Sequence, residues 1–199
     1  VGMSYRNYGT GEIQMTQVTR EDKAKWGNYS DRKNSFDDDG DYEYFIQHTL
    51  TNKKFQKYLL QHIPKGVDCK WKFKPDGDKG IDLALVDKHT GKKLLCIDLE
   101  RWGPWKDAWP HYYKYIHYLG RKDHFLEEDE PFLIVFFEYN RNKFLVCEKE
   151  TIKQYTTFNK YFIAKQRNDW VKEMKMSDGY IFGNNITDIE KRNFNDKYI

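Results

Sequence analysis

The stretch from Ile81 to Glu100 places the strongest constraint on what this chain can fold into. It contains two apolar runs, Ile81 to Asp87 and Lys93 to Glu100, joined by a short loop around His89-Thr90-Gly91. Apolar residues fill odd and even positions alike in both runs, as expected for strands that are covered on both faces. The stretch therefore predicts a β-hairpin in the middle of a sheet.

A helix and a strand are predicted before this hairpin. Between residues 41 and 62 the aromatic and aliphatic residues recur at steps of three and four, which indicates a helix that ends before Pro64 and Gly66. Cys69 to Lys74 alternates strictly and predicts a strand with one lysine-bearing face.

The region after the hairpin is less regular. Residues 104–109 could begin a helix, but Pro110 interrupts it, and residues 113–119 fit either a helix or a short strand. The remaining predicted elements are a second hairpin over residues 132–139 and 143–148, and a partly helical segment over residues 151–176.

The element order predicts an α/β sandwich around a mixed sheet. A chain of 199 residues is long enough for one domain with a real core. We expect an irregular N-terminal arm over residues 1–40, the folded domain over residues 41–176 and a loop-like C-terminal tail over residues 177–199.

Composition narrows the function classes. One third of the residues are charged, yet the net charge is only +3, which argues against a purely electrostatic nucleic-acid binder and leaves room for a local basic surface. Cys69, Cys96 and Cys147 lie in apolar runs without metal-ligand spacing, which predicts reduced core thiols in a cytoplasmic, intracellular protein. No apolar run approaches the roughly 20 residues that span a bilayer, so no membrane partner is expected.

Three carboxylates are predicted to converge at one end of the first hairpin. If the centre of the hairpin lies at Thr90, the residue numbers of two paired residues add up to 180, and Asp82 falls opposite Asp98. Glu100 follows two residues later and shares the face of Asp98. Acids at the ends of covered strands repel one another unless a cation joins them, and oxygen ligands suit Mg²⁺ or Mn²⁺. The alternative interpretation is that these acids are solvated strand ends.

Gly80-Ile81-Asp82-Leu83, the hairpin, and Ile97-Asp98-Leu99-Glu100 resemble the core of the PD-(D/E)XK nuclease superfamily. The resemblance covers roughly residues 41–148 and implies a restriction-endonuclease-like α/β/α core, with the order helix–strand–strand–strand–helix–strand. Asp82 and Asp98 match the acids of the motif, while Glu100 stands where the family usually has lysine. Glu43 lies where many members place a metal-holding glutamate on the first helix.

The resemblance implies a Mg²⁺-dependent DNA endonuclease that hydrolyses phosphodiester bonds of duplex or branched DNA. Asp82, Asp98 and Glu100 would hold the metal, with Glu43 as a further ligand. Lys106 or Lys122 would supply the positive charge of the absent lysine, since Arg101 should point to the opposite face. Family members often dimerise to cut both strands. The run Glu100-Arg101-Trp102, with later basic pairs, is also similar to nuclease-like proteins of phages and large viruses.

Two sets of residues are candidates for contacts with nucleic acid. Basic side chains could bind phosphates: Lys70, Lys72, Lys74, Arg101, Arg121 and Lys122. The three lysines of the predicted strand could equally protect a sheet edge. The aromatic residues between Trp102 and Tyr118 could stack on unpaired bases, although core packing is the preferred interpretation for most of them.

Two alternatives to an active nuclease stay open. The first is a nucleic-acid-binding protein on the same fold that has lost catalysis, which the missing lysine favours. The second is an unrelated α/β protein in which the acids coincide by chance.

Overall fold

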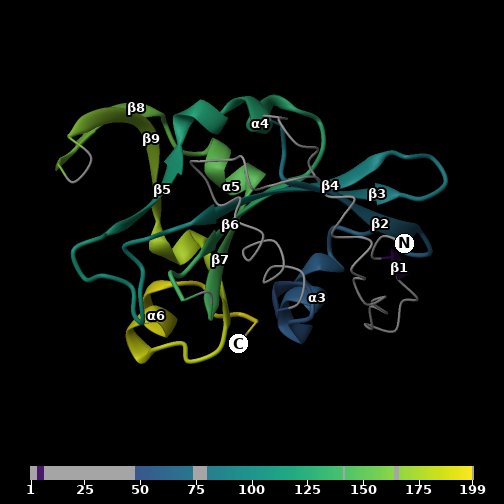
Figure 1. The fold of residues 1–199 in the computed structure, drawn as a ribbon, viewed down its shortest axis with the longest axis horizontal. Coiled ribbons are helices and arrows are strands. Elements are labelled where there is room, and N and C mark those ends of the chain that lie inside the picture. The colour runs from purple at the N-terminus through teal and green to yellow at the C-terminus, as the bar shows by residue number, and fades with distance from the viewer. Residues whose placement is uncertain (1–3, 7–47, 74–79, 141, 164–165, 199) are drawn as a thin grey trace, which may run out of the picture. The chain divides into compact units, whose positions relative to one another are not determined.

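The computed structural model describes residues 4–6, 48–73, 80–140, 142–163 and 166–198 (Figure 1). These residues form two compact units. The first reaches to Glu100 and includes Tyr198, and the second runs from Arg101 to Lys197. Helices and strands occur together in the chain, which confirms the α/β class.

The first unit is built on an antiparallel sheet in the strand order β1-β2-β3-β4. Its strands are β1 (Ser4–Arg6), β2 (Asp68–Phe73), β3 (Leu83–Asp87) and β4 (Lys93–Arg101). The strand predicted from Cys69 and the central hairpin are thus confirmed. Every side chain from Leu83 to Val86 and from Leu95 to Leu99 is buried, so both faces are covered as the sequence predicts.

The helix predicted over residues 41–62 is shorter in the part that the structure describes. Helix α3 spans Lys53–Leu59 and begins at Asn52, whose side chain accepts hydrogen bonds from the backbone of Lys54 and Phe55. Asn52 has an extended backbone and is a strong N-cap residue, so it separates α3 from the preceding turn. The apolar side of α3 is buried, and the ring of Tyr58 packs edge-on against Tyr198 at 5.4 Å.

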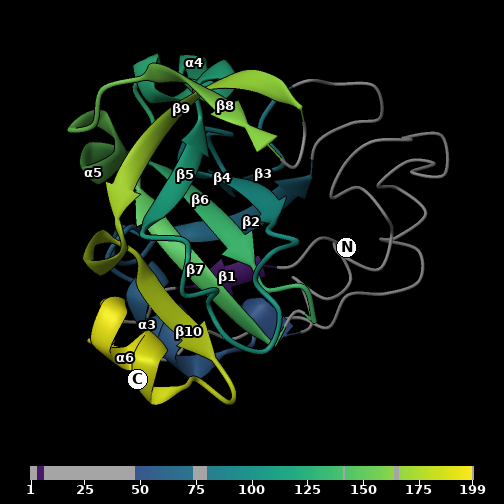
Figure 2. The ribbon, with the colours of Figure 1, turned by 90° about the vertical axis from the view of Figure 1, so that its left-hand side faces the viewer.

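The second unit contains two three-stranded antiparallel ladders, with the orders β6-β7-β10 and β5-β9-β8 (Figure 2). The strands are β5 (Tyr115–Leu119), β6 (Phe132–Phe137), β7 (Lys143–Glu148), β8 (Phe158–Phe162), β9 (Arg167–Lys175) and β10 (Tyr180–Gly183). Its short helices are η3 (Gly120–Lys122), α4 (His124–Glu127), α5 (Lys149–Lys153), η5 (Met176–Asp178) and α6 (Asp188–Asn193). The β6–β7 hairpin confirms the second predicted hairpin.

Three further expectations can be compared with this unit. Residues 104–109, which could have begun a helix, form a turn and bends, and Pro110 follows them. The segment 151–176, expected to be partly helical, is helical in α5 up to Lys153, and residues 158–162 and 167–175 form the strands of the β8–β9 hairpin. Aromatic residues favour strands, and Gln166 takes the left-handed backbone (φ 49°) that the turn needs. The segment 177–199 carries β10 and α6 instead of an irregular tail.

The structure has the order α3-β2-β3-β4, so a helix is followed by three strands. The element expected next is a helix. Between β4 and β6 the structure has strand β5, the short helix η3 and the four-residue helix α4.

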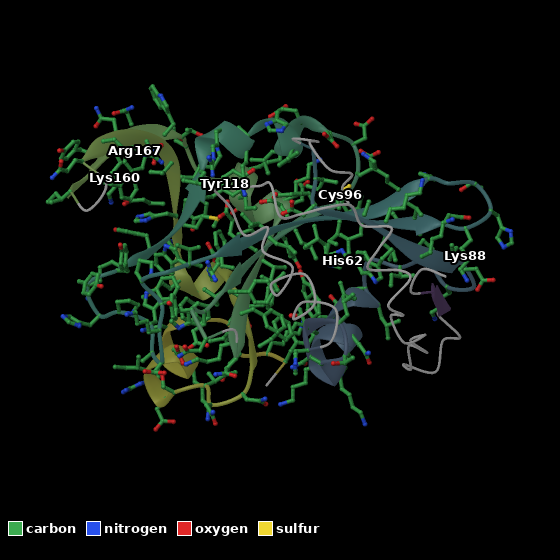
Figure 3. The ribbon with its side chains drawn as sticks, viewed as in Figure 1. His62, Lys88, Cys96, Tyr118, Lys160 and Arg167 are labelled. Atoms are coloured by element: carbon green, nitrogen blue, oxygen red, sulfur yellow. The ribbon has the colours of Figure 1, made fainter. Side chains whose placement is uncertain are left out.

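The three cysteines are buried free thiols, as predicted for core residues (Figure 3 labels Cys96). Burial raises the pKa of Cys69 to about 11, which keeps this thiol protonated and unreactive at neutral pH. None of the helices in the described part of the chain has the length and apolar character required to cross a membrane.

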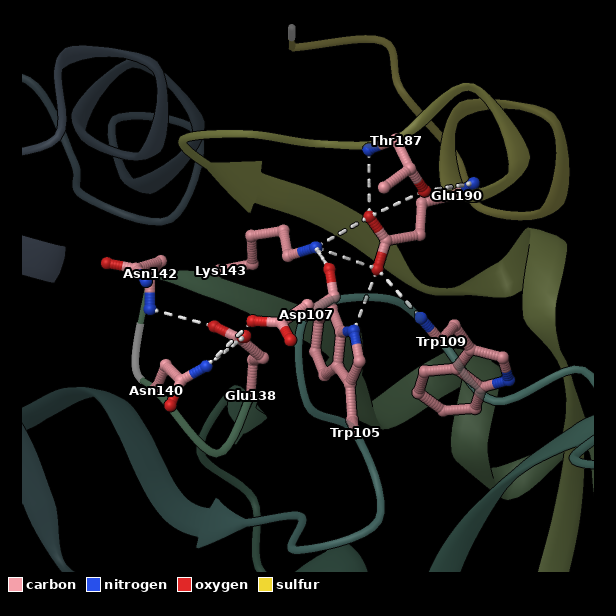
Figure 4. Close-up of polar contacts among 9 residues, drawn as sticks. All are labelled: Trp105, Asp107, Trp109, Glu138, Asn140, Asn142, Lys143, Thr187 and Glu190. Carbon is pink, nitrogen blue, oxygen red and sulfur yellow. Dashed lines mark hydrogen bonds and ion pairs between the residues drawn. The ribbon is translucent and has the colours of Figure 1, made fainter.

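A buried carboxylate organises the second unit (Figure 4). Glu190 of α6 is fully buried, and one of its oxygens accepts hydrogen bonds from the indole of Trp105 at 2.8 Å and the backbone of Trp109 at 3.0 Å. The other oxygen accepts from the backbone of Thr187 at 2.9 Å and its hydroxyl at 3.0 Å. Lys143, at the start of β7, forms a buried ion pair with the same carboxylate at 2.9 Å.

The turn between β6 and β7 is closed by a second buried acid. Glu138 accepts hydrogen bonds from the backbone of Asn142 at 3.0 Å and the amide of Asn140 at 3.4 Å (Figure 4). Burial raises the pKa of Glu138, and the hydrogen bond from Asn142 only partly opposes this rise. Glu138 thus fixes the loop that leads into Lys143.

Glu190→Gln should destabilise the protein strongly, because it leaves the ammonium of Lys143 buried without its countercharge. We expect the free energy of unfolding at neutral pH to fall by about 3–5 kcal/mol, measured by urea denaturation. The matched control is Glu150→Gln at an exposed position, which should change it by less than about 0.5 kcal/mol. A similar small change in both variants would refute a central role for the ion pair.

The same carboxylate should make stability sensitive to acid. Burial raises the pKa of Glu190, but the hydrogen bonds from Lys143, Thr187 and Trp105 outweigh it and the pKa is lowered overall. The stabilisation is therefore complete above the unfolded-state pKa of about 4.3 and is lost as the pH falls through the folded-state pKa. Below about pH 4, urea midpoints should fall more steeply for the wild type than for Glu190→Gln. Parallel curves would contradict this assignment.

Candidate functional site

The pairing of β3 with β4 brings the predicted acids Asp82 and Asp98 to the same end of the hairpin. Leu83 pairs with Ile97, and Leu85 pairs with Leu95, so paired positions add up to 180 as predicted. Continued by one residue, this register sets Asp82 opposite Asp98. Each of these two residues is only 4% exposed, which is unusual for aspartates.

A hydrogen bond holds Asp82 in place. The chain bends at Asp82 just before β3 begins, and the backbone N–H of Leu99 donates to its Oδ2 at 2.8 Å. The last paired residues of the two strands are Leu83 and Ile97, so this hydrogen bond joins the chain to β4 two residues beyond the last pair. Asp82 therefore has a structural role as well as being a candidate ligand.

The register depends on the turn at the other end of the hairpin. Oδ1 of Asp87 accepts hydrogen bonds from the backbone of His89 at 2.7 Å and Thr90 at 3.0 Å, and these bonds lower its pKa. Gly91 has a left-handed backbone (φ 72°), which glycine adopts without strain. The pairing shifts by one residue between Leu85 and Val86. On the side of the bulge that leads to Asp82, from Leu85 to Leu83, the register is the predicted one.

Glu100, the third predicted ligand, lies near the end of β4 and is partly exposed. Glu43 lies outside the described residues. Among the residues that the structure does describe, no three His, Cys, Asp or Glu side chains are gathered closely enough to hold a metal ion. A metal at Asp82 and Asp98 would thus need further ligands, such as water or a substrate phosphate.

Two of the predicted phosphate-binding lysines share the face of the acids. Lys72 pairs with Ala84 and Lys70 pairs with Val86, and alternation along β3 puts Ala84 on the face of Asp82. Diagonal neighbours in a sheet are about 7–8 Å apart, so the extended side chain of Lys72 can reach Asp82. Lys72 is exposed and makes no hydrogen bond or ion pair with the described residues. Lys74 lies outside those residues.

The other predicted basic residues belong to the second unit. Arg101 and Lys106 both lie over the ring of Tyr139, at 6.0 and 5.5 Å from its centre. Arg121 and Lys122 form part of η3, where Arg121 is exposed. Lys106 remains a predicted catalytic residue, whereas the register makes Lys72 the cation that shares the face of Asp82.

Core packing, the preferred interpretation for most aromatic residues of the segment 102–118, holds for three of the seven. Trp105, Trp109 and Tyr118 are buried, and the ring of the half-buried Trp102 lies 4.0 Å from that of Trp109. Tyr112 and Tyr115 are exposed.

Sequence reasoning missed the buried pair Lys143 and Glu190, although one signal was present. Thr187 followed three residues later by Glu190 is the pattern of a capping box, and both of its reciprocal hydrogen bonds are formed. This pattern predicts the start of α6. The additional bonds of Glu190 to Trp105 and Lys143 join segments far apart in the sequence and leave no local signal.

A scan of the chain against models of known protein families gives no match. A search of curated proteins finds no relative.

Because Asp82 accepts a hydrogen bond from Leu99, its contribution to stability can be measured separately from any role in function. Asp82→Ala removes the acceptor and should lower the free energy of unfolding by about 1–3 kcal/mol. Asp82→Asn retains an oxygen that can accept the bond and should lose less than half as much, measured by urea denaturation.

Asp129→Ala, at an exposed loop position, is the matched control and should be neutral. Equal losses in Asp82→Ala and Asp82→Asn would show that this hydrogen bond is not what Asp82 contributes.

Proposed function

We propose that this protein is a Mg²⁺-dependent DNA endonuclease whose metal site is formed by Asp82, Asp98 and Glu100. The observation that supports the proposal is the register of β3 and β4. It aligns two buried carboxylates at one end of a hairpin whose other buried residues are apolar. Two buried acids side by side repel each other, and a divalent cation relieves that repulsion.

The available donors fit such an ion. Carboxylate oxygens are preferred ligands of Mg²⁺ and Mn²⁺, and water and a scissile phosphate would complete the coordination. When bound, the ion supplies positive charge beside the phosphate and makes water a better nucleophile at neutral pH. Asp82 and Asp98 would hold it, and the N–H of Leu99 would fix the orientation of Asp82.

The remaining residues would act on the substrate. Glu100 would complete the ligand set or orient the attacking water. Lys72 would place a positive charge on the same strand face and stabilise the phosphate as negative charge develops on it. A restriction-endonuclease-like arrangement of the core, a homodimer and an origin in a phage or virus belong to this proposal.

A second candidate is a nucleic-acid-binding protein on the same fold without catalysis. It is favoured by Glu100, which stands in place of the lysine that the nuclease motif usually carries. The segment between β4 and β6 favours it further, because the resemblance implies a core helix there and the segment has strand β5 and the four-residue helix α4.

The proposal predicts that the purified protein cuts duplex or branched DNA with Mg²⁺ or Mn²⁺ and is inactive in EDTA. Asp82→Asn and Asp98→Asn should each lower the cleavage rate by at least about 100-fold, and Lys72→Ala by about 10-fold or more. The measurement is the initial rate of conversion of labelled DNA, with gel separation of products.

Lys88→Ala, an exposed lysine beside the hairpin loop, should keep the wild-type rate. Cleavage that survives in both aspartate variants would assign the activity to a contaminant or another site. DNA binding without any cleavage, across both metals, would establish the second candidate.

A further inference from the structure

The segment that leads into β5 and η3 exposes aromatic and basic side chains together. Residues 108–122 contain no aspartate or glutamate, although the whole chain has 31 of them. Tyr112 and Tyr115 are 64% and 43% exposed, and Lys114 between them is exposed as well. Cations interleaved with exposed aromatic rings, without acids, are typical of surfaces that bind nucleic acid.

A well-fixed turn presents Tyr112 to solvent. The turn over residues 110–113 is closed by a hydrogen bond from the backbone N–H of Tyr113 to the carbonyl of Pro110 at 3.0 Å. The indole of Trp109 donates to the carbonyl of Tyr113 at 2.9 Å, and the backbone N–H of Trp109 is itself bonded to the buried carboxylate of α6. The ring of Tyr113 lies 4.9 Å from that of Tyr112. Because the turn is held in place, a ligand that stacks on Tyr112 pays little conformational entropy to order it.

The register of β5 and β9 places a lysine beside Tyr115. Tyr115 pairs with Lys175, so the two side chains stand next to each other on one face of the sheet. His117, two residues further along β5, shares this face, and its ring lies 5.8 Å from that of Tyr113. Ring contacts thus lead from the turn to the strand face of Tyr115. We give the name Tyr112 surface to two exposed tyrosines and two exposed lysines: Tyr112, Lys114, Tyr115 and Lys175.

The Tyr112 surface carries positive charge that no acid balances. Two acids, Glu173 and Asp169, share the strand face of Tyr115, and each is ion-paired with a cation of β8 or β9 that Figure 3 labels. In the part of the chain that the structure describes, the ammonium groups of Lys114 and Lys175 form no ion pair or hydrogen bond. These two lysines are therefore the surplus charges of the surface, and they suit the phosphates of a nucleic acid.

We propose that the Tyr112 surface binds single-stranded nucleic acid, with bases stacked on Tyr112 and Tyr115 and phosphates beside Lys114 and Lys175. Aromatic rings stack on any unpaired base, whereas the bases of a duplex are already stacked on one another. A second copy of the chain is a poorer occupant, because a two-fold interface would bring the same surplus lysines against each other. This inference does not depend on the carboxylate site.

The test is fluorescence anisotropy of the full chain with a labelled thymidine oligonucleotide of about 15 nucleotides, in EDTA so that cleavage plays no part. Tyr112→Ala and Tyr115→Ala should each weaken binding about 10-fold, whereas Tyr112→Phe and Tyr115→Phe keep the rings and should bind almost as the wild type does. Tyr161→Ala, at an exposed tyrosine of β8, is the matched control and should bind as the wild type does. A uridine oligonucleotide of the same length shows whether DNA or RNA is preferred.

The lysines are tested through the salt dependence of binding. Each phosphate contact contributes about 0.7 to the slope of log affinity against log salt concentration for a single strand. Lys114→Gln combined with Lys175→Gln should therefore lower the slope by about 1.4. Lys153→Gln, at an exposed position of α5, is the matched control and should leave the slope unchanged.

The outcomes separate this proposal from its competitors. Unchanged affinity in the Tyr112→Ala, Tyr115→Ala double variant, or tighter binding of a duplex of the same length, would overturn it. An equal change of slope in Lys153→Gln would reduce the binding to general attraction by the whole chain and would also overturn it. Self-association that the double tyrosine variant abolishes, seen by analytical ultracentrifugation without binding of either oligonucleotide, would instead assign the surface to a second copy of the chain.

A loss of affinity supports the proposal when the thermal midpoint of the variant equals that of the wild type, because folding is then intact. Since EDTA removes divalent metal from this assay, a failure here leaves the proposed nuclease activity to its own test.

Discussion

The carboxylate of Glu190 is the interaction on which the second unit depends. It joins the loop of Trp105 and Trp109, the start of β7 at Lys143 and the helix α6, which are separated by dozens of residues in the chain. Each oxygen receives three donors, so the cost of burying the charge is offset by hydrogen bonds as well as by the ion pair. Loops with little regular structure of their own can then hold one conformation, because their backbone and indole donors share a fixed acceptor.

The first unit relies on register rather than on a buried ion pair. A slip of one residue between β3 and β4 would move every side chain to the other face, and would separate Asp82 from Asp98. The Asp87 turn and the bulge after Leu85 set the register at one end, and the Asp82 bond to Leu99 sets it at the other. The acids at the candidate site are thus placed by the same bonds that define the hairpin.

The sequence was most informative where a pattern is local. Alternation in β2, apolar runs in β3 and β4, and the β6–β7 hairpin were all predictable, because strand periodicity and turn chemistry act over a few residues. The register of Leu83 to Leu85 with Leu95 to Ile97 followed from the same arithmetic. The β8–β9 hairpin was missed because its two strands present aromatic residues to solvent, which hides the alternation of buried and exposed positions. The partners of Glu190 were beyond reach because they are distant in sequence, and the capping box at Thr187 predicts only the helix start.

Binding of the substrate is a separate requirement for the proposed DNA endonuclease. Carboxylates repel the phosphates of the substrate, so an acidic site alone gives no affinity, and binding energy must come from groups away from the reacting bond. Lys72, which the proposal sets beside the reacting phosphate on the strand face of Asp82, is a single exposed lysine and contributes little to binding at physiological salt.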